Sequence, residues 1–126
     1  MITGLHHATL LSSDLAASRA FYEGVLGLQP DIRRPAMSFD GIWYQLADGR
    51  QIHLMRLPDP DASAVRPAHG GRDRHLAMNV SNLQELAQRL ELAGIDYTPS
   101  QSQRPALFCR DPDGNALEFI ATSNEP

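Results

Sequence analysis

The chain has 126 residues, of which 42% are hydrophobic and 21% charged, and its formal net charge is −4. These values are typical of a folded globular domain that buries roughly two-thirds of its unfolded surface. The acidic balance and the lack of basic runs disfavour nucleic acid and anionic membranes as partners. No apolar stretch is long enough to span a membrane, the N-terminus lacks the pattern of a secretory signal, and the single Cys109 cannot form an internal disulfide, so we expect a cytoplasmic protein.

The first 57 residues carry the signals of one βαβββ module. Residues 3–11 alternate as a strand, with His7 and Thr9 on one face. A capping segment at 12–14 precedes a helical pattern over 15–26 that Gly27 ends. Residues 29–35 are expected to be extended, and Asp48-Gly49 joins strands 41–47 and 50–57 as a hairpin.

The same order of signals returns in the second half. Residues 58–73 are rich in Pro, Gly and Asp, which predicts a linker in which His69 is solvated. A strand over 74–80, a helix over 83–93, a short strand over 95–98 and a hairpin of 106–110 with 115–121 follow. The sequence therefore predicts a single α+β domain built from tandem βαβββ modules, 3–57 and 74–121.

Four side chains of metal-ligand type fall at equivalent places in the two modules. His7 and His75 occupy the first strands, and His53 and Glu118 occupy the last strands. Glu118 interrupts an apolar run, where an unpaired carboxylate is costly, so its partner is expected to be a cation. Three imidazoles and one carboxylate suit a divalent ion such as Zn, Ni, Co, Mn or Fe. A lone strand histidine is more often structural, so this hypothesis depends on the repeat.

Several motifs extend the pattern: His7-Ala8-Thr9-Leu10, Val25-Leu26-Gly27-Leu28 and Asp111-Pro112-Asp113-Gly114-Asn115 with Leu117-Glu118-Phe119. With these motifs the chain resembles the vicinal oxygen chelate superfamily, which includes glyoxalase I, bleomycin resistance proteins, epimerases, extradiol dioxygenases and fosfomycin resistance enzymes. The resemblance covers residues 3–121 and implies a glyoxalase-like fold with a cupped sheet around one metal ion. It places the metal ligands on His7, His53, His75 and Glu118, makes Glu118 the proton-transfer base and implies a homodimer.

The resemblance favours a metal-dependent lyase or isomerase of glyoxalase or epimerase type, similar to lactoylglutathione lyase, acting on a small carbonyl-containing substrate. Glyoxalase I commonly has carboxylates at both last-strand positions, whereas His53 stands at the first here. An extradiol dioxygenase uses three ligands, and a fourth at His53 would occupy a site for its substrates. A fosfomycin-type thiol transferase has an apolar residue there. The alternative that is not an enzyme is a metal-free protein that binds a drug or another small molecule.

Candidate substrate contacts are Thr9, Trp43, Tyr44, Arg104 and Arg110. A guanidinium holds a carboxylate or phosphate through paired hydrogen bonds, so the two arginines suit an anionic group. Arg110 has an equally good alternative role in pairing with Asp111 or Asp113. Cys109 is expected to be a packing residue and not a nucleophile, because no histidine stands near it in the hairpin.

Overall fold

The computed structural model describes residues 1–100, 102 and 104–122. It divides into two compact units, Met1–Ser63 and Ala64–Pro126. The boundary falls within the stretch 58–73 that the sequence predicts to be a linker. None of the helices in the described ranges is both long and apolar enough to cross a lipid bilayer.

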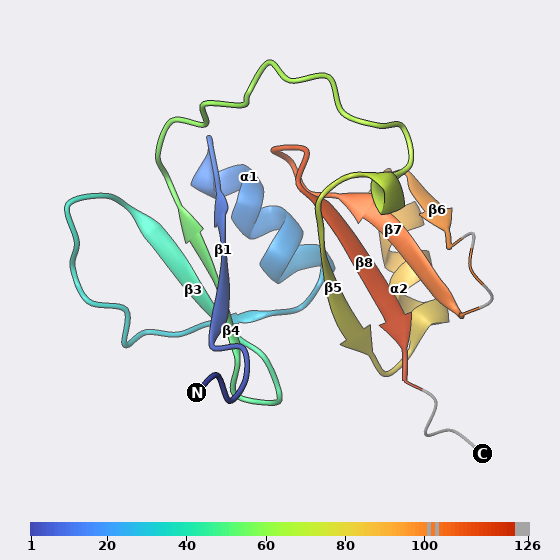
Figure 1. The fold of residues 1–126 in the computed structure, drawn as a ribbon, viewed down its shortest axis with the longest axis horizontal. Coiled ribbons are helices and arrows are strands. Elements are labelled where there is room, and N and C mark those ends of the chain that lie inside the picture. Colours follow the sequence, from blue (N-terminus) through green and yellow to red (C-terminus); the bar gives the residue numbers. More distant parts are fainter. Residues whose placement is uncertain (101, 103, 123–126) are drawn as a thin grey trace. The chain divides into compact units, whose positions relative to one another are not determined.

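Unit 1 is a four-stranded sheet with one helical segment, coloured blue to green in Figure 1. Its elements are β1 (His7–Leu11), α1 (Leu15–Arg19), η1 (Ala20–Val25), β2 (Gln29–Pro30), β3 (Gly41–Gln45) and β4 (Gln51–Met55). The strand order is β1-β4-β3-β2, with β1 parallel to β4 and the other neighbours antiparallel. The first and last strands of the unit are therefore side by side.

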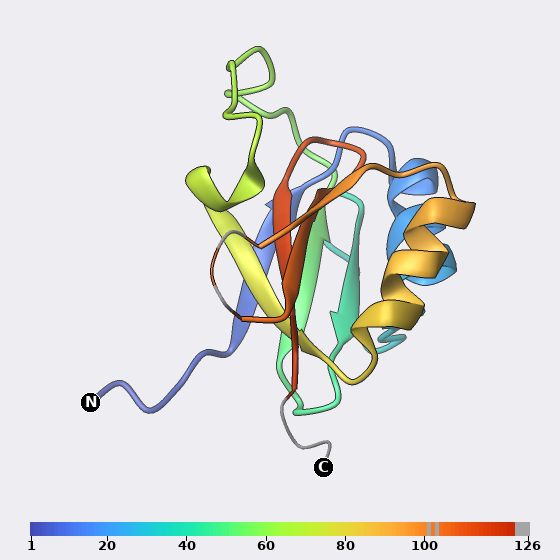
Figure 2. The ribbon, with the colours of Figure 1, turned by 90° about the vertical axis from the view of Figure 1, so that its right-hand side faces the viewer.

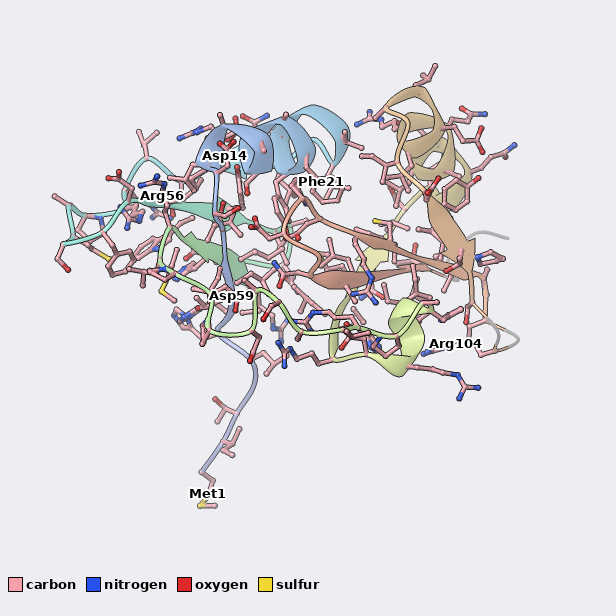
Figure 3. All side chains as sticks on the ribbon, turned by 90° about the horizontal axis from the view of Figure 1, so that it is seen from above. Met1, Asp14, Phe21, Arg56, Asp59 and Arg104 are labelled. Carbon is pink, nitrogen blue, oxygen red and sulfur yellow. The ribbon has the colours of Figure 1, made fainter. Side chains whose placement is uncertain are left out.

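The helical segment of unit 1 differs from the single α-helix that the sequence predicts over 15–26. Asp14 caps its start by accepting hydrogen bonds from two main-chain N–H groups, and it lies at this end of α1 in Figure 3. After Arg19 the segment continues as a π-helix. The wider turn brings consecutive residues nearer to one side. Phe21 and Tyr22 are accordingly both buried, with exposed fractions of 3% and 0%.

Unit 2 repeats this architecture in the yellow-green to red part of the chain. Its elements are η2 (Gly70–Arg72), β5 (His75–Val80), α2 (Leu83–Leu92), β6 (Tyr97–Pro99), β7 (Ala106–Arg110) and β8 (Ala116–Ala121). The strand order is β5-β8-β7-β6, with β5 parallel to β8. Figure 2 shows α2 running alongside this sheet. The predicted βαβββ repeat is thereby confirmed in both halves.

Each sheet has one face that packs against its helix. In unit 1 the residues buried on this face are Ile42, Tyr44, Ile52 and Leu54. In unit 2 they are Leu107, Cys109, Leu117 and Phe119. Because side chains alternate along a strand, the residues between these project from the opposite face, which we call the site face of each unit.

The two acidic turns form at the predicted places, although the first connects β3 and β4 through residues 46–50 and not through two residues, and they fix the pairing of the last two strands in each unit. Gly49 and Gly114 have φ angles of 88° and 83°, a region that glycine enters without steric cost. In the second turn the Asp111 carboxylate accepts hydrogen bonds from the main-chain N–H groups of Asp113 and Asn115. Trp43 consequently lies opposite His53, and Phe108 opposite Glu118.

Some boundaries differ from those predicted. β1 begins at His7 and not at residue 3, and β2 covers two residues and not 29–35. His69, which the sequence predicts to be solvated, is partly exposed and also has contacts within its unit. Its ring accepts a hydrogen bond from the Gly71 N–H to begin η2, and it meets the Phe108 ring edge-on at 5.0 Å. Linker composition alone did not indicate this contact, because its partner lies on a distant strand.

Candidate active site

A row of three side chains crosses the site face of unit 1. Thr9, His53 and Trp43 stand opposite one another on β1, β4 and β3. The His53 ring is stacked between two others: its centre lies 4.4 Å from that of Trp43 and 4.0 Å from that of His7. His7 and His53, both predicted as metal ligands, are thus brought together in this unit.

The protonation of His53 follows from its hydrogen-bonded neighbours. The Asp31 carboxylate accepts a hydrogen bond from the side-chain N–H of Gln51, at 2.9 Å. The Gln51 carbonyl oxygen therefore faces His53 Nε2, at 2.8 Å, and can only accept. His53 must carry its proton on Nε2, which leaves the lone pair of Nδ1 for another partner.

His53 is a neutral imidazole at physiological pH. Burial, together with the nearby His7, His6 and Arg34, lowers the pKa of His53 to about 4. A neutral ring is the form that binds a metal ion. The planes of His7 and His53 are only 18° apart, so their in-plane lone pairs run alongside each other. Binding of one ion by both rings therefore requires one ring to turn.

The carboxylate of unit 2 is buried beside a histidine ring. Glu118 is 4% exposed, and its Oε1 lies 3.2 Å from His75 Nε2. His75 Nδ1 lies 2.9 Å from the main-chain oxygen of Asp73, which can only accept a hydrogen bond. In neutral His75 the Nε2 lone pair consequently faces a carboxylate oxygen. Two acceptors in this position require a proton or a cation to join them.

The spacing of this pair fits a metal ion. Ligand atoms about 2.1 Å from an ion, with a bond angle of roughly 90–110°, lie about 3.0–3.4 Å apart. The observed 3.2 Å is within that range. The hydrogen bond from Nδ1 to a carbonyl is also the usual way in which a ligating histidine is oriented. Glu118 and His75 therefore have the donor chemistry of two neighbouring ligands.

The four predicted ligands are divided equally between the units. Unit 1 supplies His7 and His53, and unit 2 supplies His75 and Glu118. Within the described part of the chain, no group of three or more His, Cys, Asp or Glu side chains is arranged around a common point for an ion. The structure thus describes two pairs.

The two predicted substrate arginines have different surroundings. Arg104 is 62% exposed, and its Nη2 lies 3.4 Å from Glu118 Oε2, a long and weak contact. Arg110 instead donates to the Asp73 carboxylate at 2.8 Å and to the main-chain oxygens of Gly114 and Pro67. Through these contacts the Arg110 guanidinium connects the segment around η2 with the last hairpin.

Tyr44 does not project from the site face. It is fully buried against η1, stacks with Tyr22 at 5.7 Å and donates a 2.8 Å hydrogen bond to Glu23. The predicted substrate contact through Tyr44 is therefore not supported. Trp43, its neighbour on β3, does project from the site face because side chains alternate along the strand.

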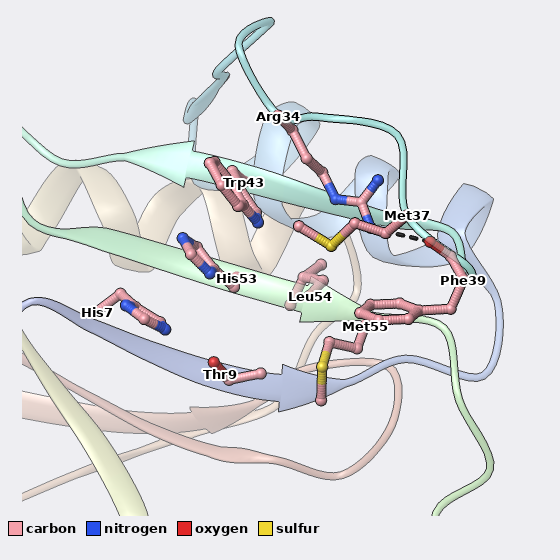
Figure 4. A pocket seen from close by; sticks show the side chains of 9 residues that line it. All are labelled: His7, Thr9, Arg34, Met37, Phe39, Trp43, His53, Leu54 and Met55. Carbon is pink, nitrogen blue, oxygen red and sulfur yellow. Dashed lines mark hydrogen bonds between the residues drawn. The ribbon is translucent and has the colours of Figure 1, made fainter.

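A pocket of about 170 Å³ opens on the site face of unit 1 (Figure 4). The residues predicted to act there, His7, Thr9, Trp43 and His53, line it. Sequence reasoning missed the rest of its wall: Arg34, Met37, Phe39, Leu54 and Met55. Three of these lie between β2 and β3, in a segment without strand or helix periodicity, so no local signal indicated their position. Met55 shares its strand face with His53, which was a usable signal.

The profile of the Glyoxalase/Bleomycin resistance protein/Dioxygenase superfamily matches residues 4–119. The chain belongs to this superfamily. It is 31% identical to Glyoxylase I 4 of Arabidopsis thaliana over 131 aligned positions, which cover 99% of this chain and 74% of that protein. It is 28% identical to the glutathione transferase FosA of Serratia marcescens, over 94% of this chain and 81% of the other.

Solved structures agree on the fold of this superfamily. The fosfomycin resistance protein FosX of Listeria monocytogenes, in a complex with Mn(II) and sulfate, aligns with a TM-score of 0.75 at 21% identity. The alignment covers 99% of this chain and 94% of FosX. The predicted glyoxalase-like fold is confirmed, and the superfamily contains proteins that bind a divalent metal ion.

The only cysteine in the sequence, Cys109, is buried and is expected to be a poor nucleophile. Cys109 is 4% exposed, and burial, with the nearby charge of Asp111, raises the pKa of its thiol to about 12. A thiol with so high a pKa stays protonated at neutral pH and is a poor nucleophile. This agrees with the packing role expected from the sequence.

Proposed function

We propose that this chain is a metal-dependent enzyme of glyoxalase or epimerase type, which moves a proton at the carbon next to a carbonyl of a small oxygenated substrate. The main support is the pair of Glu118 and His75, a buried carboxylate facing an imidazole whose other nitrogen is already engaged. A buried carboxylate with such weak compensation is expected where a cation binds.

The residues that would hold the ion are His7, His53, His75 and Glu118, two from each unit. When bound, a divalent ion would polarise the substrate carbonyl and stabilise negative charge on its oxygen. His53 would offer Nδ1, because Gln51 engages the proton on Nε2. This set of nitrogen and oxygen donors suits Zn, Ni, Co, Mn or Fe.

Glu118 is the proposed base. Its carboxylate can accept the substrate's proton and return it to the neighbouring carbon, which is the chemistry of an isomerase or lyase. At the position of Glu118, unit 1 has His53 stacked between two rings. Proton transfer by two symmetric carboxylates is therefore not available, so an epimerisation would need water or a second group to return the proton on the other face of the substrate.

Two residues would position the substrate beside this base. Thr9 lies in the pocket wall next to His53 and offers a hydroxyl group. Arg104 is exposed and only weakly attached to Glu118, so it is free to approach an anionic substrate group. We also propose a homodimer on the basis of the family resemblance, and light scattering at the monomer mass would contradict it.

The test is proton exchange with solvent. Protein loaded separately with each of the five metals is incubated in D₂O with the hemithioacetal of methylglyoxal and glutathione, and with a 2-methyl-3-oxo thioester. We expect deuterium to enter at the carbon next to the carbonyl faster than in protein-free solution with at least one metal, and this acceleration to be lost in Glu118→Gln. Exchange at an equal rate in Glu118→Gln would show that the base lies elsewhere, and absence of acceleration with every metal would contradict the proposal.

Thiol transfer to fosfomycin is the second candidate, because the glutathione transferase FosA is among the relatives of this chain. Mass spectrometry of fosfomycin incubated with glutathione and the metal-loaded protein would detect the adduct. An extradiol dioxygenase would instead consume oxygen with a catechol. A metal-free binding protein would retain no ion after loading, which elemental analysis would show.

A further inference from the structure

Arg34 is the one charged side chain in the lining of the unit 1 pocket, and its guanidinium is incompletely paired. Its Nη2 donates a 3.0 Å hydrogen bond to the main-chain oxygen of Phe39. Its Nε is buried and has no hydrogen-bond partner among the described residues. A buried N–H of a cation without a partner is costly, so its retention needs an explanation.

The sequence provides a specific seat for this guanidinium. A Cβ on Gly41 would lie 2.4 Å from the main-chain oxygen of Leu54 and 2.9 Å from Arg34 Nη2. Only glycine allows the arginine to lie directly against the sheet at this point. The Phe39 ring also lies 5.6 Å from the guanidinium carbon. The arginine is thus held in place by its surroundings and is not a freely moving surface side chain.

The remaining lining is complementary to an anion that has an apolar body. Met37, Phe39, Trp43 and Met55 supply apolar and aromatic surface, and no lining residue is acidic. Figure 4 shows Arg34 beside Met37 and Phe39, with Trp43 and His53 farther along the same face. A ligand in this pocket would therefore meet a positive charge, an apolar wall and the polar pair Thr9 and His53.

We propose that this pocket binds the anionic group of a small substrate, a carboxylate or phosphonate, with Arg34 as its cationic partner and Trp43 against its apolar body. A guanidinium carries a full positive charge and several N–H donors, which are the features that such anionic groups accept. The proposal rests on the proposed function only in placing the reacting end of the substrate near Thr9 and His53. Binding of the anion itself needs no metal ion.

Metal-free protein provides the test, because the chain has a single tryptophan, Trp43, in the pocket wall. Benzoate, phenylphosphonate and the neutral benzamide are titrated in the presence of EDTA, and the one indole N–H signal is followed by NMR. We expect saturable shifts with benzoate or phenylphosphonate, and the two probes distinguish which anion fits. Benzamide should bind at least about tenfold more weakly, because it lacks the charge.

The variants are Arg34→Gln, which removes the charge, and Arg34→Lys, which keeps it. Arg56→Gln is the matched control, since Arg56 is an exposed arginine that does not line the pocket. We expect the affinity for the anionic probes to fall about tenfold or more in Arg34→Gln, to fall less in Arg34→Lys and to stay unchanged in Arg56→Gln. If Arg34→Gln fails to fold, the ratio of benzoate to benzamide affinity in the unchanged protein still decides.

Equal binding of benzoate and benzamide, or no binding of either anion, would overturn the anion site. An equal loss of affinity for the anionic probes in Arg34→Gln and Arg56→Gln would overturn the role of Arg34. Because these measurements use metal-free protein, they are independent of the solvent-exchange reaction, so either proposal can fail while the other stands.

Discussion

The two units share one architecture but carry different chemistry at matching positions. The row Thr9, His53 and Trp43 in unit 1 corresponds to the row Ala77, Glu118 and Phe108 in unit 2. The middle position is a neutral imidazole in one unit and a buried carboxylate in the other. The repeat therefore preserves where a functional side chain stands, while the residue type sets what each unit contributes.

One histidine in each unit is held by a hydrogen bond, and the acceptor of that bond differs between the units. In unit 1 His53 is fixed by a side chain, Gln51, which is itself held by Asp31. In unit 2 the position matching Gln51 is Ala116, and His75 is fixed by a main-chain oxygen instead. The orientation of His53 is thus more easily altered by a substitution than that of His75, because the acceptor for His75 is a main-chain oxygen.

Substitution of Glu118 should have the largest effect, and this effect is on metal binding. We expect Glu118→Gln to weaken binding of a divalent ion about 100-fold or more, and His53→Gln to weaken it less, because only the acid supplies a negative charge. Without metal, Glu118→Gln should be at least as stable as the unchanged protein, since it removes a weakly compensated buried charge. Chelator competition and thermal unfolding in EDTA measure the two quantities. A strongly destabilised metal-free variant would mean that Glu118 is mainly structural.

The next largest effect concerns Cys109, the counterpart of Tyr44 on the helix-facing side of unit 2. With a pKa of about 12 against an ordinary 9.0, the thiolate fraction at pH 8 is lower by about a thousandfold. A disulfide reagent such as DTNB should therefore react very slowly with the folded protein and rapidly after addition of denaturant. Rapid reaction of the native protein would show that this face of unit 2 opens readily.

Tyr44→Phe tests the corresponding position in unit 1. The substitution removes the 2.8 Å hydrogen bond to Glu23 and leaves the ring packing intact. We expect a loss of about 1–2 kcal/mol in the free energy of unfolding, measured with urea, because the acceptor is a carboxylate. Affinity for benzoate should not change. A reduced affinity would restore Tyr44 as a substrate contact.

The smallest expected effect is that of Gln51→Met. Loss of the amide should allow the proton of His53 to redistribute between Nε2 and Nδ1, with a change in stability of about 1 kcal/mol or less. Nitrogen-15 NMR of the histidine rings distinguishes the two tautomers. His75 serves as an internal control, because its proton is fixed by the backbone of unit 2. An unchanged His53 signal would mean that the ring stack alone sets the tautomer.

The sequence was sufficient for the repeat, the two hairpin turns and the pairing of equivalent positions. These features depend on local patterns, such as Asp48-Gly49 and Asp113-Gly114, and on the alternation of side chains along a strand. The same alternation, applied strictly, would have removed Tyr44 from the site, because it is adjacent to Trp43 on one strand.

Contacts between distant segments could not be predicted from the sequence. Arg110 binds Asp73 and Pro67, about 40 positions earlier, and neither contact follows from the composition of the hairpin. Arg34 likewise gains its role from Gly41 and Phe39 in a segment without regular periodicity. The change from α-helix to π-helix after Arg19 also has no simple motif, since it depends on packing of Phe21 and Tyr22.

The most direct measurement is the metal content of the purified protein after loading and desalting, compared with His7→Ala from one half and His75→Ala from the other. If residues of both units bind the same ion, we expect one ion per chain in the unchanged protein and a large loss of that ion in each variant. No retained ion in the unchanged protein, or full retention when either histidine is removed, would contradict this expectation.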